Sequence, residues 1–298
     1  PRPPRGLKAV CAGPILRHAH HHPLDKRTVR SAGLRLFLCL PIVLVVPFRA
    51  QAQATGRALF VGVDNYLDPE INDLTCTVAD AKLLAGLLTD PSRGFFPKDQ
   101  VRVLTDDATE DSLKPDRLSI LEGVEWLSQV EPDETVLFYF SGHGMLDDKG
   151  RQYLVCRDAK LSALPYTAVP VDLVNEVLDD PDRTKARQVV VIFDSCHSGV
   201  RRGAKSLESE SGAVIAALLT EAEGRVTLSS CSADEQSCED QERRHGIFTF
   251  YLAEGLKGLA DANGDGLIGV GELHVFVRGA VTKWASAHRH RQTPRVQS

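Results

Sequence analysis

Two runs of apolar β-forming residues, each stopped by a small polar residue and then by a His or a Cys, constrain this chain most. The first, at residues 138–144, reads Phe-Tyr-Phe-Ser-Gly-His-Gly, and the second, at 189–199, reads Val-Val-Val-Ile-Phe-Asp-Ser-Cys-His-Ser-Gly. Buried parallel strands have such runs, and open α/β sheets carry functional residues just beyond the carboxyl ends of their strands. The sequence therefore predicts two parallel strands that bring an imidazole, His143, and a thiol, Cys196, to one edge of a sheet.

Strand-like and helix-like segments alternate along the rest of the chain. The expected strands are 57–63, 100–104, 135–140, 188–193 and 225–229, with a hairpin near 152–156, and the expected helices are 78–88, 116–129, 171–178 and 213–222. This order predicts an α/β fold, a mostly parallel sheet with helices on both faces. The 298 residues are 43% hydrophobic, enough for a sizeable core, and the net charge of −5 without a basic patch argues against a nucleic-acid partner.

Residues 1–54 have the features of an N-terminal extension with a secretory signal. Arg27 and Arg30 precede an apolar stretch at 34–48, and a small-x-small cleavage pattern follows at 50–54. We therefore expect export to a periplasm or to the medium, and we assign 55–298 to the folded domain. The alternative is an uncleaved segment, which is the only membrane association that the sequence predicts.

His143 and Cys196 are the candidate catalytic pair. A cysteine nucleophile needs a neighbouring base to become a thiolate, and His is the usual base. The two residues are 53 positions apart, which allows one crossover and an extra hairpin, so adjacent strands can bring them within hydrogen-bonding reach. Either residue alone is more often structural, but both follow strands and both are flanked by glycines that let backbone amides approach a substrate.

These motifs resemble those of the caspase-family cysteine peptidases, and most of all the metacaspases and bacterial caspase-like proteins. Ser-Gly-His-Gly at 141–144 and Asp-x-Cys-His-Ser-Gly at 194–199 are intact, whereas the animal caspase form Gln-Ala-Cys-x-Gly is absent. The resemblance covers about 57–282. It implies a caspase–hemoglobinase fold, protein or peptide substrates, catalysis without a cofactor, and an oxyanion hole made by the amides of Gly144 and Cys196.

In metacaspases the pocket for the residue before the cleaved bond is acidic. The resemblance assigns Asp80, Ser141 and Asp194 to this pocket, and Asp80 lies in a segment, 74–81, that matches the family pattern. Two carboxylates that converge on one pocket suit an Arg or Lys side chain, so the resemblance implies cleavage after basic residues. The alternative is that Asp194 caps a turn and that Asp80 lies on a solvated helix face.

The segment from Asp261 to Glu272 satisfies the pattern D-x-[DN]-x-[DN]-G-x₅-E of a calcium-binding EF-hand loop. The expected ligands are Asp261, Asn263, Asp265, the backbone oxygen of Leu267, and Glu272. Helical segments at 248–259 and 273–284 flank the loop, so we expect a C-terminal EF-hand-like helix-loop-helix. No partner hand is visible, and a Gly-rich acidic turn without metal is the alternative.

The sequence thus predicts an exported cysteine endopeptidase that cleaves after Arg or Lys. His143 takes the proton of Cys196, the sulfur attacks the scissile carbonyl, and the imidazole then protonates the departing amine. Two alternatives stay open: a peptidase of the same fold with a different side-chain preference, and a catalytically silent caspase-like interaction module with a calcium-binding hand. The sequence does not predict the oligomeric state.

Overall fold

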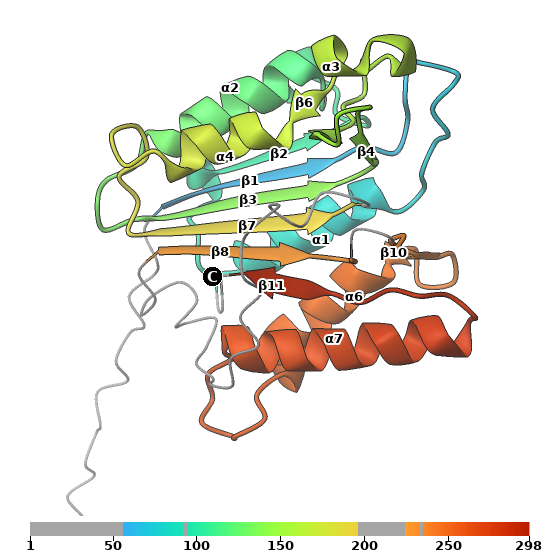
Figure 1. Ribbon diagram of the computed structural model, residues 1–298. Coiled ribbons are helices and arrows are strands. Elements are labelled where there is room, and N and C mark those ends of the chain that lie inside the picture. Colours follow the sequence, from blue (N-terminus) through green and yellow to red (C-terminus); the bar gives the residue numbers. More distant parts are fainter. Residues whose placement is uncertain (1–55, 92–93, 196–223, 233–234, 298) are drawn as a thin grey trace, which may run out of the picture. The chain divides into compact units, whose positions relative to one another are not determined.

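The two apolar runs form neighbouring strands at the centre of a six-stranded sheet with the order β11-β8-β7-β3-β1-β2 (Figure 1). The computed structural model describes residues 56–91, 94–195, 224–232 and 235–297, which all belong to one unit of the chain. The parallel strands are β1 (Gly56–Gly62), β2 (Val101–Thr105), β3 (Thr135–Ser141), β7 (Gln188–Asp194) and β8 (Gly224–Ser229). A short strand, β11 (Arg295–Gln297), pairs antiparallel with β8. The predicted mostly parallel sheet is confirmed.

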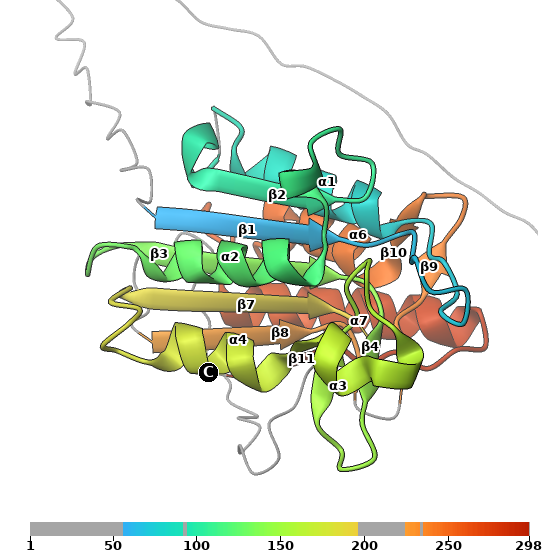
Figure 2. The ribbon, with the colours of Figure 1, turned by 90° about the horizontal axis from the view of Figure 1, so that it is seen from above.

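Helices cover both faces of the sheet, as the alternating order predicts. On one face lie α2 (Arg117–Ser128) and α4 (Val171–Asp179), and on the other lie α1 (Thr77–Leu88), α6 (Ile247–Glu254) and α7 (Val270–Ala287) (Figures 1 and 2). The helix expected at 213–222 lies outside the described residues. In the part of the chain that the structure describes, no helix has the length and apolar content needed to cross a bilayer.

Each strand supplies side chains to two separate cores, because successive residues of a strand point to opposite faces. Leu59 and Val61 pack with α2 and α4, whereas Ala58 and Phe60 pack with α1, α6 and α7. β3 and β7 are buried along their whole length. This burial on both faces explains why their sequences are continuous apolar runs, and it holds the residues that follow them in place.

Short elements surround the carboxyl edge of the sheet. β4 (Gly144–Leu146), β5 (Gln152–Leu154) and β6 (Val169–Pro170) form a small antiparallel sheet, the helix α3 (Leu164–Thr167) precedes β6, and β9 (Glu239–Asp240) pairs with β10 (His245–Gly246). The hairpin expected near 152–156 is β4–β5. From β1 the chain runs to β2 on one side and then to β3, β7 and β8 on the other, so a topological switch point lies between β1 and β3. Open α/β sheets bind ligands at such points.

The segment after β10 differs from the expected helix at 248–259. α6 ends at Glu254, and a π-helical turn, Gly255–Leu259, follows. Gly258 has a φ of 125°, a conformation that favours glycine and ends the regular helix. The second expected helix, 273–284, is part of the longer α7.

Candidate active site

A cavity of about 230 Å³ lies at the carboxyl ends of β3 and β7, beside the switch point. It is lined by residues 141–143 at and after the end of β3, and by Asp194 at the end of β7 and Ser195 after it. The other lining residues are Leu74, Thr77 and Asp80 around the start of α1, residues 236–239, and Gly246. Four of the predicted site residues, His143, Asp80, Ser141 and Asp194, therefore line one cavity. The strand order brings them together from three distant parts of the chain.

Cys196, the predicted nucleophile, lies outside the described residues. Ser195, the residue before it, lines the same cavity as His143. Gly144, the other predicted oxyanion donor, begins β4 and pairs with Leu154. The direct approach of Cys196 to His143 and Gly144 stays a prediction.

Backbone and aromatic groups hold the imidazole of His143. Its Nε2 lies 2.8 Å from the carbonyl oxygen of Asn72, which can only accept a hydrogen bond. Nε2 therefore carries the hydrogen in the neutral ring, and Nδ1 is the basic nitrogen. The amide of His143 also donates to the Tyr66 hydroxyl at 2.9 Å, and the two rings lie 5.1 Å apart. The contribution of Asn72 has no sequence signal, because every residue has a carbonyl.

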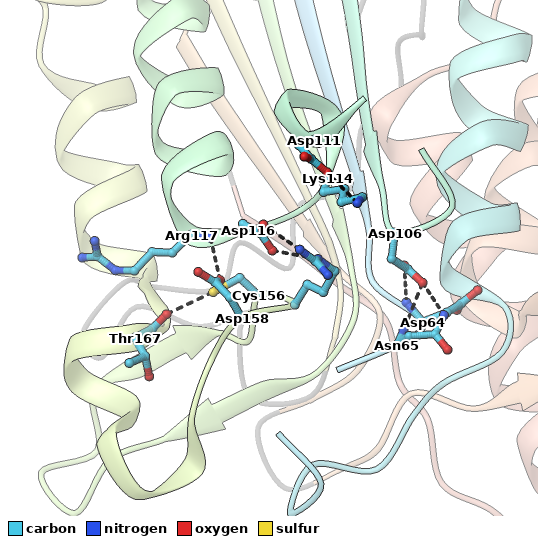
Figure 3. Close-up of polar contacts among 11 residues, drawn as sticks. Asp64, Asn65, Asp106, Asp111, Lys114, Asp116, Arg117, Cys156, Asp158 and Thr167 are labelled. Atoms are coloured by element: carbon cyan, nitrogen blue, oxygen red, sulfur yellow. Dashed lines mark hydrogen bonds and ion pairs between the residues drawn. The ribbon is translucent and has the colours of Figure 1, made fainter. Parts of the chain in front are cut away.

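Hydrogen bonds to carboxylates stabilise the loop after β1, which contains Asn72. Asp106 accepts the amide of Asp64 at 2.9 Å, and Asp73 accepts the amide of Tyr66 at 2.9 Å. Asp64, Asn65 and Asp106 lie together beside the end of β2 (Figure 3). These bonds fix the course of the loop and, with it, the carbonyl that holds His143.

The loop after β5 is braced in a similar way. Asp158 accepts the amide of Arg117 at the start of α2, and Arg157 forms a bidentate ion pair with Asp116, each bond being 2.8 Å long (Figure 3). Cys156 donates to a backbone carbonyl at 3.1 Å, and burial raises the pKa of its thiol. Cys156 therefore stays protonated and has a structural role.

Asp80 and Asp194 approach each other beside Gly246, at the place where another residue would have a side chain. A β-carbon built on Gly246 would lie 2.7 Å from Oδ2 of Asp80 and 2.9 Å from Oδ2 of Asp194. Ser141 is the register partner of Asp194 across β3 and β7. The side chain of Asp80 is only 1% exposed, so it does not lie on a solvated helix face. A pair of buried carboxylates thus lines the cavity beside His143.

Two chains of hydrogen bonds end on Asp194. Its Oδ1 accepts the Ser237 hydroxyl at 2.6 Å, and its Oδ2 accepts the Thr249 hydroxyl at 2.7 Å. Gln292 Nε2 donates to Ser237 at 3.1 Å, and the Tyr139 hydroxyl lies 2.7 Å from Thr249 Oγ1. Because Thr249 donates its hydrogen to Asp194, Tyr139 donates to Thr249. Burial raises the pKa of Asp194 while these bonds oppose the rise, and both oxygens accept as those of an ionised carboxylate do.

Asp80 has different partners. Its Oδ1 lies 2.7 Å from Nδ1 of His245, and its Oδ2 accepts the amide of Gly246 at 2.9 Å. Burial raises the pKa of Asp80 to about 7; the hydrogen bond with His245 opposes the rise, and the charge of Asp194 adds to it. Asp80 therefore changes charge near neutral pH.

The cavity wall at 236–239 was not predicted from the sequence. Gln292, which is 1% exposed, holds it: Oε1 accepts the Cys238 amide at 3.1 Å, and Nε2 donates to the Ser230 carbonyl and to Ser237. Glu235 accepts the amide and the hydroxyl of Thr293 at 2.6 and 3.0 Å. The local sequence signal for these contacts was the pair of polar residues Gln292 and Thr293.

The loop at 261–269 is closed by its own side chains. Asp261 accepts the amides of Gly264 and Gly266 at 2.7 and 3.0 Å, and Glu272 accepts that of Gly269 at 3.0 Å. Gly264 and Gly266 have φ values of 76° and 82°. Within the described ranges, no three His, Cys, Asp or Glu side chains are grouped to hold a metal ion. Asp261 and Glu272 thus accept hydrogen bonds from backbone amides.

The fold and the cavity together define a caspase-like α/β protein. A family model for the caspase domain matches residues 55–298. The chain belongs to this family, and the resemblance seen in its motifs is confirmed.

Relatives and a solved structure agree with this assignment. The chain is 29% identical over 152 residues to metacaspase-1 of Schizosaccharomyces pombe, covering 49% of this chain and 35% of the relative. It is 33% identical over 170 residues to metacaspase-5 of Trypanosoma cruzi, covering 54% and 36%. The matches thus span about a third of these curated relatives. Caspase-1 from Spodoptera frugiperda has the same fold, with a TM-score of 0.55 and 17% identity over 83% of this chain and 87% of that structure.

Proposed function

We propose that this protein is a cysteine endopeptidase whose catalytic pair is His143 and Cys196. One observation carries the proposal: His143 and Ser195, the residue before Cys196, line the same cavity at the switch point. The Asn72 carbonyl supports it, because it selects the tautomer with a basic Nδ1. Membership of the caspase domain family and the similarity to metacaspases agree with it.

The proposed reaction proceeds through an acyl-enzyme. Nδ1 of His143 takes the thiol proton of Cys196, and the thiolate attacks the scissile carbonyl. The amides of Gly144 and Cys196 stabilise the oxyanion, and His143 gives its proton to the departing amine. A water molecule, deprotonated by His143, then hydrolyses the thioester. These steps use no cofactor.

We propose further that the enzyme cleaves after Arg or Lys. Asp80, Asp194 and Ser141 line the same cavity as His143 and Ser195, and in the proposed enzyme this cavity would accommodate the side chain before the cleaved bond. Two buried carboxylates offer a guanidinium or ammonium group charge-assisted hydrogen bonds. An acidic side chain would meet like charges there. The charge of the cavity therefore supports cleavage after Arg or Lys over the other side-chain preferences that peptidases of this fold could have.

A panel of fluorogenic peptides that differ only in Arg, Lys, Asn or Asp before the cleaved bond tests both proposals. We expect turnover of the Arg and Lys peptides, and a loss of about 10³-fold or more in Cys196→Ala. A peptide with an arginyl electrophile should label the wild type and not Cys196→Ala. Equal labelling of the two proteins would contradict the peptidase proposal and favour a silent interaction module. Preferred cleavage after Asn or Asp would contradict only the basic preference.

We also propose that the loop from Asp261 to Glu272 binds Ca²⁺ as an EF-hand. Its oxygens stand at loop positions one, three, five, seven and twelve, and Gly266 provides the turn at position six. Calorimetric titration with Ca²⁺ tests the proposal, with Glu272→Gln expected to weaken binding and Glu254→Gln, in α6, to leave it unchanged. An absence of Ca²⁺ binding by the wild type would support the metal-free acidic turn instead.

Export remains a separate proposal, supported by the basic, apolar and small-residue pattern of residues 27–54. Expression of the chain followed by N-terminal sequencing of the exported product tests it. We expect a new N-terminus near residues 52–55 in a soluble fraction. An intact N-terminus in a membrane pellet would show that the segment is an anchor.

A further inference from the structure

The two carboxylates of the cavity are stabilised by different chemistry. Asp194 accepts hydrogen bonds from two neutral hydroxyls, those of Ser237 and Thr249. Asp80 instead contacts an imidazole, that of His245. Among the residues that the structure describes, no Lys or Arg forms an ion pair with either carboxylate, and His245 is the one basic side chain bonded to the pair. Any positive charge that compensates the pair in the described part of the chain therefore comes from His245.

His245 acts on Asp80 from outside the cavity. The cavity lining includes Asp80 and Gly246 but not His245. The His245 side chain is 22% exposed, while that of Asp80 is 1% exposed. His245 lies in β10 directly before Gly246, whose missing side chain leaves room for both carboxylates. The imidazole can thus influence the charge of the cavity without touching a substrate side chain.

We propose that His245 is a positioning residue for substrate preference: its imidazole favours the ionised form of Asp80, so that the cavity presents two carboxylates to a basic side chain in neutral to alkaline solution. This inference rests on the proposed cleavage after Arg or Lys. It goes beyond the acidic residues implied by the family, because it assigns the ionisation of one of them to a residue outside the cavity.

Several other charged groups near His245 have partners of their own. Asp240, opposite His245 in the hairpin, is paired with Arg243. Glu239 accepts the amide of Cys76 at 2.9 Å. The titratable and charged groups on the segments next to the imidazole are Asp80 and Cys76 at the start of α1, Asp194 of β7, Glu239 and Asp240 of β9, and Glu242, Arg243 and Arg244 of the hairpin turn. Burial raises the pKa of Cys76 to about 12, so this thiol carries no charge at neutral pH.

Removing the imidazole must disfavour the charged form of Asp80. Burial raises the pKa of Asp80 to about 7 even with His245 in contact, and the contact with His245 opposes that rise. Without the imidazole, Asp80 ionises only at a higher pH. A neutral carboxyl group attracts a guanidinium group less than a carboxylate does. When the solution is acidified, a variant without the imidazole should therefore lose its preference for basic substrates at a higher pH than the wild type does.

The test compares two peptides that differ only in arginine or citrulline, its uncharged analogue, before the cleaved bond. The ratio of their kcat/KM values cancels the titration of His143 and Cys196, which both peptides share. We would measure this ratio between pH 5.5 and 9 for the wild type, His245→Asn, His245→Ala and His290→Asn. Asn keeps a hydrogen-bond donor near the position of Nδ1 but cannot carry a charge, and His290→Asn is the matched surface control.

In the wild type and in His290→Asn, we expect the ratio to fall as the pH drops through about 7. In His245→Asn the midpoint should move to higher pH, which lowers the ratio at pH 7 by about fivefold for a shift of one pH unit. The kcat/KM for the citrulline peptide should not change. If His245→Ala fails to fold, His245→Asn carries the test.

Each outcome has a definite meaning. Identical ratio profiles for the wild type and His245→Asn would overturn the role of His245 while leaving the basic preference in place. A wild type that cleaves the arginine and citrulline peptides equally at pH 9 would overturn the proposed basic preference, and this inference with it.

Discussion

Sequence motifs located some of the site's functional side chains but not the side chains that hydrogen-bond to them. His143 was predicted because a polar residue at the end of an apolar strand is a local signal, and Asp194 because it matches the family motif around the cysteine. Thr249 and Ser237 were not, because they meet Asp194 from 55 and 43 positions away in the chain. Their hydroxyls reach Asp194 only because α6 and the cavity wall at 236–239 pack against β7. Local patterns therefore located the acids but not the groups that hydrogen-bond to them.

The hydroxyl of Thr249 should be needed for binding of a basic side chain. Thr249→Val keeps the shape but leaves the Tyr139 hydroxyl and one oxygen of Asp194 without their shared partner. An unsatisfied buried polar group costs about 1–3 kcal/mol. We expect KM for Arg peptides to rise about tenfold with little change in kcat. Thr89→Val, at the end of α1, is the control, and an unchanged KM in Thr249→Val would contradict the role of this bond.

Asp80 should favour function at the expense of stability. Its folded pKa of about 7 lies above its ordinary value of 3.8, so folding takes up a proton between these pH values and disfavours the ionised carboxylate above them. Asp80→Asn should therefore raise Tm at pH 8, by roughly 2–4 °C per kcal/mol gained, and the gain should shrink as the pH falls towards 4. Thermal unfolding at pH 5 and pH 8 measures this. A variant that melts at a lower temperature than the wild type at pH 8 would refute it.

Helices and strands were predicted best where burial determines the sequence pattern. β3 and β7 match the expected strands to within one residue because both faces of each are covered. The helix expected at 248–259 was wrong at its end, because Gly255 packs so closely on α7 that a β-carbon would lie 2.7 Å from Leu273, and Gly258 turns the chain. β11 was not predicted, since three residues are too few to show a period. The end of α6 and the short strand β11 thus depend on contacts between elements, which a local sequence pattern does not show.

The segment before β11 should control both the cavity wall and folding. Gln292→Leu would leave the Cys238 amide and the Ser230 carbonyl without the bonds they make to Gln292. We expect the free energy of unfolding to fall by about 2–4 kcal/mol and KM for Arg peptides to rise. Urea unfolding and steady-state kinetics measure the two effects. The exposed Gln129→Leu serves as control, and full stability of Gln292→Leu would show that the segment does not hold the wall.

For the whole molecule, the strand order matters more than any one motif. The reversal between β1 and β3 brings the Asn72 loop, His143 and the end of β7 to one edge, although they are far apart in the sequence. The sequence predicted this edge because an α/β chain with two interrupted strands has few other arrangements. It did not predict how α1 and the β9–β10 hairpin enclose the acids, since that depends on long-range packing. The cavity is therefore a property of the assembled fold.

A cation that fits the cavity should stabilise the whole fold even when no reaction takes place. Butylguanidinium resembles the end of an arginine side chain, and butylurea is an uncharged analogue of similar shape. In Cys196→Ala, which excludes turnover, a ligand present at about 100 times its Kd adds about 2.7 kcal/mol to the free energy of unfolding. We expect butylguanidinium to raise Tm at pH 8, and to raise it less at pH 5, where Asp80 is protonated. Butylurea should have no effect, and Asp194→Asn should abolish most of the gain. Equal shifts with the two ligands would mean that the carboxylates do not recognise the cation, and cleavage after Arg or Lys would then need another explanation.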